Sequence, residues 1–244
     1  PVGAESDGTP VDLDVAVYTA DGLDGPAPAV LLAHGFGGKR QDLVAQARRL
    51  AAEGYVVLTW TARGFGESGG RIHLNAPAYE VEDASALLDL LAARDDVLLD
   101  AAGDPRVGIA GGSYGGAIAL LAAGYDQRVD AIAPRITWND LAASLFPQFA
   151  TAGDPSTAAA FEPVADPGVF KRLWAGVFFG SGSASAEDPT ICGRFAEDVC
   201  DAYGASAATG VPTPEILDLL AASSPASVLD RIEAPTLLLQ GQAD

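Results

Sequence analysis

A serine flanked by glycines is the residue of this sequence best suited to chemistry. The pattern Gly-x-Ser-x-Gly surrounds Ser113, with Gly111 two residues before it and Gly115 two residues after it. The preceding RVGIAGG is typical of a buried strand, and the following AIALLAAG is typical of a helix. A strained turn between a strand and a helix exposes the serine oxygen, and glycines let the two elements approach closely. This context predicts Ser113 to be the nucleophile of an acyl-transfer reaction.

The same pattern occurs a second time, around Ser68. There it is followed by RIHLNAPAYE, which shows no helical periodicity. We therefore interpret Ser68 as a loop serine near the site and not as the nucleophile.

Acyl transfer also needs two backbone amides directed at the negative charge that develops on the substrate oxygen. Tyr114 directly follows the nucleophile and supplies the first amide. LLAHGFGG places His34, Gly35 and Phe36 at the end of an apolar run, so the Phe36 amide is the second candidate and the other two residues support it. A plain glycine-rich turn or a phosphate-binding loop is the alternative, although the glycine spacing and the lysine of known phosphate loops are not present.

A serine hydroxyl also needs a base, and in this arrangement an Asp or Glu and then a His follow the serine along the chain. Asp244 fits the acid, because it follows PTLLLQG, which we predict to be a buried central strand. The two histidines of the chain, His34 and His73, both precede Ser113. His73 is a candidate substitute base, but the chain order favours a histidine in a segment beyond Asp244 that was lost, cleaved or disordered. A C-terminal fragment of the same protein that carries this histidine is therefore an expected partner.

Strands and helices that alternate along the chain must position these residues. Residues 11–20 alternate apolar and polar side chains as an edge strand does, and apolar runs and helical periods then follow each other up to residue 136. Between about residues 137 and 222 helical segments such as FKRLWAGVFF and EILDLLAAS replace this alternation. The prediction is an α/β-hydrolase fold, with a mostly parallel, doubly wound sheet, a helical cap inserted before the last strands, and missing C-terminal elements. The predicted domains are the first part of the core (1–136), the cap (137–222) and the continued core (223–244), which ends at the acid.

Composition narrows the classes of partner. The formal net charge is −19, which opposes binding to nucleic acid and to anionic membranes. No apolar run is long enough to span a bilayer. We therefore expect neither nucleic-acid nor membrane partners. An excess of acidic residues is typical of a solvated surface. Recognition of a cationic substrate is the alternative explanation.

The two cysteines, Cys192 and Cys200, lie eight positions apart, and they are too few for a zinc site without further ligands. A local disulfide is the prediction. The chain begins at Pro1 and contains no methionine, which suggests a processed or trimmed start. Together these features favour a secreted or cell-surface location after processing, with the cytoplasm as the alternative.

Several motifs together carry a resemblance to a known family. HGFGG, ARGFGESGG, GGSYGG, PRITWND, FKRLWAGVFFGSG and SPASVLDRIEAPTLLLQGQAD resemble the X-Pro dipeptidyl-peptidase-like hydrolases, a group that includes cocaine-esterase-like acyl hydrolases. The resemblance covers nearly the whole chain. It implies a Ser-Asp-His triad with Ser113, Asp244 and a histidine absent from these residues, and oxyanion donors at Phe36 and Tyr114. Hydrolysis through an acyl-enzyme needs no metal and no organic cofactor, so we expect neither.

The resemblance leaves the substrate open between the amino end of a peptide and a small ester or amide. A dipeptidase would need cap carboxylates to hold a free ammonium group. The candidates are Glu162, Asp166, Glu187, Asp188, Glu197 and Asp198.

Arg135, Trp138 and Asp140 are candidates for lining the pocket, with structural packing as the alternative. Two further functions stay open: a carboxylesterase or a polymer or lipid esterase with a wide apolar cleft, and a non-catalytic binding module that lacks the histidine.

Overall fold

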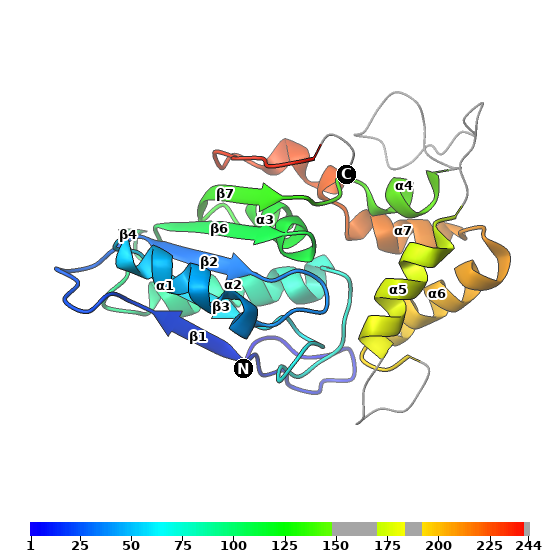
Figure 1. The fold of residues 1–244 in the computed structure, drawn as a ribbon, viewed down its shortest axis with the longest axis horizontal. Coiled ribbons are helices and arrows are strands. Elements are labelled where there is room, and N and C mark those ends of the chain that lie inside the picture. The colour runs from blue at the N-terminus through cyan, green and yellow to red at the C-terminus, as the bar shows by residue number, and fades with distance from the viewer. Residues whose placement is uncertain (148–169, 184–191, 242–244) are drawn as a thin grey trace.

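A parallel sheet flanked by helices forms the body of the protein in the computed structural model, which describes residues 1–147, 170–183 and 192–241 (Figure 1). The strands are β1 (Val15–Tyr18), β2 (Ala29–Ala33), β3 (Val56–Trp60), β4 (Leu99–Ala101), β5 (Asp104–Pro105), β6 (Val107–Gly112) and β7 (Val129–Arg135). The α-helices are α1 (Val44–Ala52), α2 (Glu82–Ala92), α3 (Tyr114–Tyr125), α4 (Leu141–Leu145), α5 (Arg172–Ser183), α6 (Glu197–Thr209) and α7 (Pro214–Ala222). Short helical turns are η1 (Arg40–Leu43), η2 (Pro77–Val81), η4 (Pro225–Ser227) and η5 (Leu229–Arg231).

The main sheet has the strand order β1-β3-β2-β6-β7. The alternation over residues 11–20 predicts an edge strand, and β1 lies within this range at the edge of the sheet. It is antiparallel to β3, and the other pairs are parallel. Parallel strands end at the same edge of a sheet, so the carboxyl ends of β2 and β6 lie side by side. The loop after β2 and the turn after β6 are therefore neighbours.

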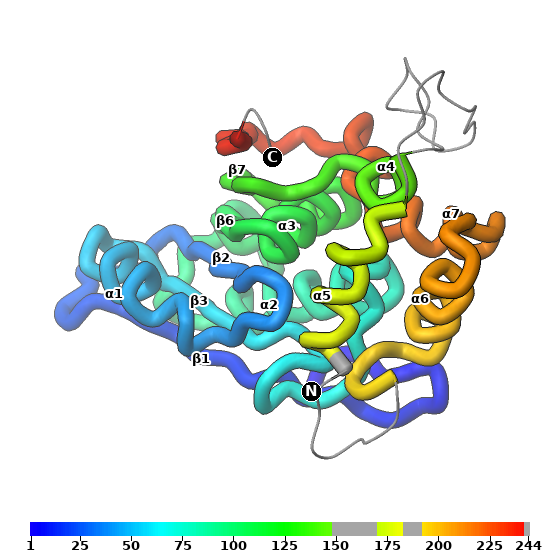
Figure 2. Tube along the Cα trace, turned by 45° about the vertical axis from the view of Figure 1, so that its right-hand side comes forward, coloured from blue at the N-terminus to red at the C-terminus, as the bar shows by residue number. Residues whose placement is uncertain are grey.

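Helices cover both faces of this sheet. Helix α1 packs on one face, and α2 and α3 pack on the other (Figures 1 and 2). All five residues of β3 are buried, as expected for a strand with both faces covered. In α3 every residue from Tyr114 to Gly124 is buried, so the helix that leaves Ser113 is fixed within the core.

The segment after η5 runs parallel to β7, with bridges from Ile132 to Thr236 and from Arg135 to Leu239. The prediction of a buried central strand here is wrong for the described residues. Leu237, Leu238 and Leu239 are 63%, 59% and 48% exposed. The physical reason is that β7 pairs with one side of this segment, and no strand of the described part pairs with the other.

Helices α4 to α7 lie together beyond one end of the sheet (Figures 1 and 2). Their shared core contains Ala142, Phe146, Phe170, Ile216 and Leu220. In the described part of the chain, no helix is both long and apolar enough to cross a membrane.

Candidate active site

The turn at Ser113 has the strained geometry that the glycine pattern predicts. Ser113 has φ 54° and ψ −118° and lies directly between β6 and α3. A Cβ atom on Gly111 would lie 2.4 Å from the carbonyl oxygen of Gly115, and one on Gly115 would lie 2.4 Å from the carbonyl oxygen of Ala33. Only glycine fits at both positions, because real Cβ contacts are not that short.

The loop after β2 lies against this turn. A Cβ atom on Gly35 would be 3.8 Å from the Cβ of Ser113 and 3.6 Å from the carbonyl oxygen of Gly112. The amide of Phe36, which follows Gly35, therefore belongs to the loop that borders the nucleophile. The Phe36 ring packs edge-on against Tyr114 at 5.5 Å between ring centroids. The structure thus brings Ser113, Phe36 and Tyr114 together.

His34 holds the loop and does not approach the nucleophile as a base. Its Nε2 accepts a hydrogen bond of 2.9 Å from the amide of Ala62, so Nδ1 carries the proton and donates to the carbonyl oxygen of Gly35 at 2.7 Å. Burial lowers the pKa of His34, although the bond to Gly35 acts in the opposite direction. Both ring nitrogens of the neutral histidine are therefore occupied.

His73 faces other partners as well. Its Nε2 lies 2.7 Å from Oε2 of Glu5, and its ring stacks on Tyr79 with 3.5 Å between centroids. Burial lowers the pKa of His73 despite the neighbouring Glu5. Ser68 is structural: its hydroxyl donates to the carbonyl oxygen of Thr61 and accepts from the amide of Asp14.

A largely apolar cavity of about 190 Å³ opens beside Ser113. Its walls come from the loop after β2, the start of α3, and helices α4 to α7. Aromatic and aliphatic side chains dominate, among them Phe36, Leu74, Trp138, Phe146, Phe178 and Phe195. Such a lining suits an uncharged, apolar group next to the nucleophile.

Of the residues predicted to line the pocket, Trp138 does so, and its Nε1 donates to the carbonyl oxygen of Ser223. Arg135 lies next to the turn, because a Cβ atom on Gly112 would be 3.2 Å from its Nε. The carbonyl oxygen of Arg135 also accepts from the Ser113 amide at 2.9 Å. Asp140 instead caps α4 by accepting from the amide of Ala143.

Five predicted carboxylates lie outside the described residues: Asp244, Glu162, Asp166, Glu187 and Asp188. The other two, Glu197 and Asp198, are exposed at the start of α6. Asp198 borders a second cavity of about 490 Å³ with His73 and Tyr79. Neither residue lines the cavity at Ser113. In the described part of the chain, no group of three or more His, Cys, Asp or Glu side chains is arranged to hold a metal ion.

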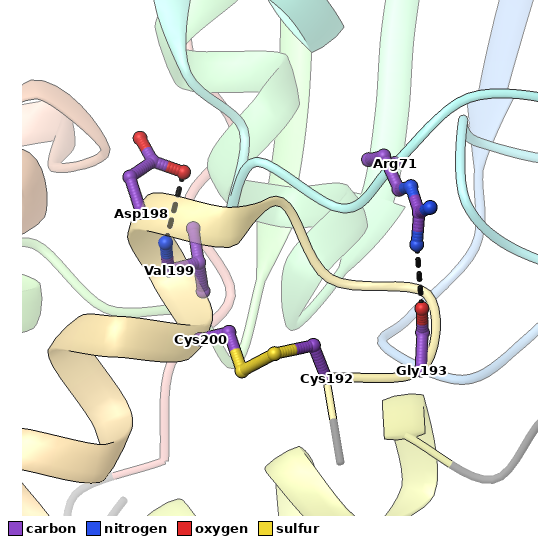
Figure 3. The surroundings of a disulfide bond; sticks show 6 residues. All are labelled: Arg71, Cys192, Gly193, Asp198, Val199 and Cys200. Atoms are coloured by element: carbon purple, nitrogen blue, oxygen red, sulfur yellow. Dashed lines mark hydrogen bonds between the residues drawn. A yellow bond between two sulfur atoms is a disulfide. The ribbon is translucent and has the colours of Figure 1, made fainter. Parts of the chain in front are cut away.

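Cys192 and Cys200 form a disulfide at the start of α6 (Figure 3). The carbonyl oxygen of Gly193, next to Cys192, accepts a 2.7 Å hydrogen bond from Arg71 (Figure 3). Ile72 also exchanges backbone hydrogen bonds with Arg194 and Ala196. The disulfide therefore stabilises a segment that pairs with the loop leading to His73.

A buried polar group behind Tyr114 was not predicted from the sequence. The phenol oxygen of Tyr114 accepts from the amide of Asn75 at 3.0 Å and donates to Oε1 of Glu80 at 3.1 Å. The Asn75 side chain donates to the carbonyl oxygen of Tyr114 at 3.0 Å. The only sequence signal was a Glu within HLNAPAYE, a stretch without helical period, and this does not indicate burial.

Comparisons with known proteins bear on the family and the fold of the chain. The family model described as X-Pro dipeptidyl-peptidase (S15 family) matches residues 7–163. An uncharacterized 31.7 kDa protein of Escherichia coli is 33% identical over 114 residues, which are 46% of this chain and 38% of that protein. The quorum-quenching protein AidA of Acinetobacter baumannii (strain MDR-ZJ06) is 35% identical over 116 residues, which are 46% of this chain and 36% of that protein. The chain therefore matches well under two thirds of the length of these curated relatives.

Among solved structures, an acetyl xylan esterase from Paenibacillus sp. R4 superposes with a TM-score of 0.54 at 19% identity. The superposition covers 96% of this chain and 65% of the esterase. At this identity the likeness shows the fold, which is the α/β-hydrolase fold. With the family match over more than half of its residues, the chain belongs to the X-Pro dipeptidyl-peptidase (S15) family.

Proposed function

We propose that the protein is a serine hydrolase that forms an acyl-enzyme on Ser113. One observation carries the proposal: Ser113 sits in a strained turn between β6 and α3, at the wall of an apolar cavity and against the loop at Gly35. Strain of this kind persists where the surroundings enforce it, and it is common at reacting residues. Family membership supports the same reaction class.

In the proposed mechanism, the Ser113 oxygen attacks the substrate carbonyl carbon and its proton passes to a base. The amides of Phe36 and Tyr114 stabilise the oxyanion, the leaving group departs with the proton, and water then releases the acyl group. His34 and His73 are both engaged elsewhere. We therefore propose a histidine outside these 244 residues as the base, oriented by Asp244.

For the substrate, we propose first a peptide with proline as its second residue, on the strength of the family. A second candidate is a carboxylic ester with an apolar acyl group. The apolar lining of the cavity favours it, as does the position of Glu197 and Asp198 away from that lining.

A fluorophosphonate probe and two substrates test the proposal on the full-length protein. Ser113→Ala should abolish probe labelling and lower kcat by at least about a thousandfold, because the nucleophile is lost. Ser181→Ala is the control, since Ser181 is exposed on α5.

The ratio of kcat/KM for an Ala-Pro-p-nitroanilide and for p-nitrophenyl butyrate decides between peptide and ester. Equal labelling and hydrolysis by the wild type and the Ser113→Ala variant would refute the proposal. Binding of either substrate without turnover by the wild type would instead support a non-catalytic binding module.

We also propose that the protein is exported, because disulfides persist in oxidising compartments and Cys192 and Cys200 form one. Fractionation of the native cells, with the protein found only in the cytoplasm, would refute this.

A further inference from the structure

Two adjacent residues beside the candidate active site have a strained backbone. Leu74 has φ 61° and Asn75 has φ 64°, and neither is glycine. A left-handed backbone is unfavourable for residues with a side chain, so surrounding contacts must hold it. Leu74 also lines the apolar cavity. The loop of residues 73–76 therefore links a strained backbone to the wall of the site.

One buried carboxylate holds both ends of this loop. Oε1 of Glu80 accepts from the amide of His73 at 2.8 Å, and Oε2 accepts from the amide of Ala76 at 3.0 Å. Glu80 is only 3% exposed. The two bonds bracket Leu74 and Asn75, so the carboxylate enforces their positive φ angles.

The same loop holds Tyr114 at two points. Asn75 binds the carbonyl oxygen of Tyr114 with its side chain and the phenol oxygen with its amide. The phenol in turn donates to Glu80. Because Tyr114 follows Ser113, these contacts fix the peptide units next to the nucleophile.

We propose that Glu80 is a positioning residue whose carboxylate, through the loop 73–76 and the Tyr114 phenol, aims the Tyr114 amide at the oxyanion. The inference rests on the proposed serine-hydrolase function. Glu80 itself does not touch the substrate, since the cavity at Ser113 is lined by Tyr114 and Leu74 and not by Glu80.

Glu80 changes its ionisation state near neutral pH. Burial raises its pKa to about 7, because desolvation outweighs the backbone hydrogen bonds and the attraction of Arg63. A cavity of about 10 Å³, roughly the space of one water, borders Glu80. The titratable and charged groups around Glu80 are Glu5, His34, Arg63, His73, Asp83 and Tyr114.

Protonation would change the contacts of Glu80. The carboxylate accepts three hydrogen bonds, from His73, Ala76 and the Tyr114 phenol. The neutral acid carries a proton on one oxygen and loses acceptor capacity there. The loop and Tyr114 should therefore be held correctly above the pKa of Glu80 and less well below it.

The experiment compares kcat/KM of the wild type and of Glu80→Gln from pH 5.5 to 9 in the full-length protein. The wild type should match the variant within about twofold at pH 5.5, where Glu80 is protonated, and exceed it about tenfold at pH 9, a difference of roughly 1.4 kcal/mol. Titration of the catalytic base cancels in this ratio. Glu82→Gln is the control, because Glu82 is exposed at the start of α2, directly after the turn η2 that contains Glu80, and this variant should follow the wild type at every pH.

A second variant keeps the test decisive if Glu80→Gln fails to fold. Tyr114→Phe keeps the amide but removes the phenol link, so kcat should fall several-fold while KM stays within about twofold. The inference is overturned if the ratio of kcat/KM between the wild type and Glu80→Gln does not vary with pH, or if kcat of Tyr114→Phe is unchanged. In either case an inactive Ser113→Ala variant leaves the proposed function standing. If Ser113→Ala keeps its activity, the proposed function fails and the inference fails with it.

Discussion

At the scale of single residues, the site depends on places where no side chain fits. Gly111 and Gly115 lie where β6, α3 and the end of β2 touch, and either Cβ atom would come within 2.4 Å of a backbone oxygen. Backbone atoms cannot move aside as a flexible side chain can. Any side chain at these two glycines should therefore strain the packing at Ser113.

Gly115→Ala should lower the free energy of unfolding by about 2 to 4 kcal/mol, because the new methyl group collides with the carbonyl of Ala33. Gly204→Ala is the matched control on α6, where a Cβ atom would meet nothing within 4 Å. That change should leave stability equal or raise it by up to about 1 kcal/mol, since alanine favours helices. Urea denaturation of both variants measures the difference, and similar values for the two would contradict the steric argument.

Local patterns predicted the residues around Ser113, because glycines and a strand-to-helix change are visible over a few positions. Glu80 could not be found in this way. Its burial depends on the loop 73–76 and on Tyr114, which lies 34 positions away along the chain. The two histidines were candidates by type alone, and only the packing shows that Ala62, Gly35 and Glu5 occupy them.

At the scale of elements, the sequence predicted the strands and helices around the central sheet. It predicted the helices beyond the end of the sheet only in part. The run YGGAIALLAAGY coincides with α3, and VDAIAPR coincides with β7. Helix α6 was not predicted, because EDVCDAYGASAAT combines glycine with small residues and gives a weak apolar period. The apolar run after Pro235 suggested a buried strand, but burial depends on a neighbour on each side and not on the run itself.

The disulfide should stabilise the start of α6. By the loop-entropy argument, closing a loop of eight positions contributes about 2 to 3 kcal/mol. Reduction with a phosphine should therefore lower the thermal midpoint of the wild type. The double variant Cys192→Ser, Cys200→Ser should unfold at the lower temperature with or without the reductant. If the reductant left the wild-type midpoint unchanged, the bond would contribute nothing to stability.

At the scale of the whole molecule, the net charge of −19 acts against the folded state through self-repulsion. Raising the ionic strength from about 0.01 M to 0.2 M shortens the screening distance from about 30 Å to under 10 Å. The thermal midpoint should rise by a few degrees, corresponding to about 1 kcal/mol. Differential scanning fluorimetry in sodium and potassium chloride should give equal shifts at equal ionic strength, and a shift that depends on the ion would indicate specific binding instead.

The first residues of the chain are joined to the support of the site through Glu5. Its carboxylate accepts from the amide of Arg71 at 2.8 Å, lies 3.3 Å from Nη1 of Arg63 and contacts the ring of His73. Removing this short stretch would take from the His73 ring its carboxylate partner inside the protein, and would leave Arg63 with Asp83 as its acid partner. A recombinant protein that begins after Glu5 therefore lacks a contact that supports the candidate active site. Its activity should be interpreted as that of a variant.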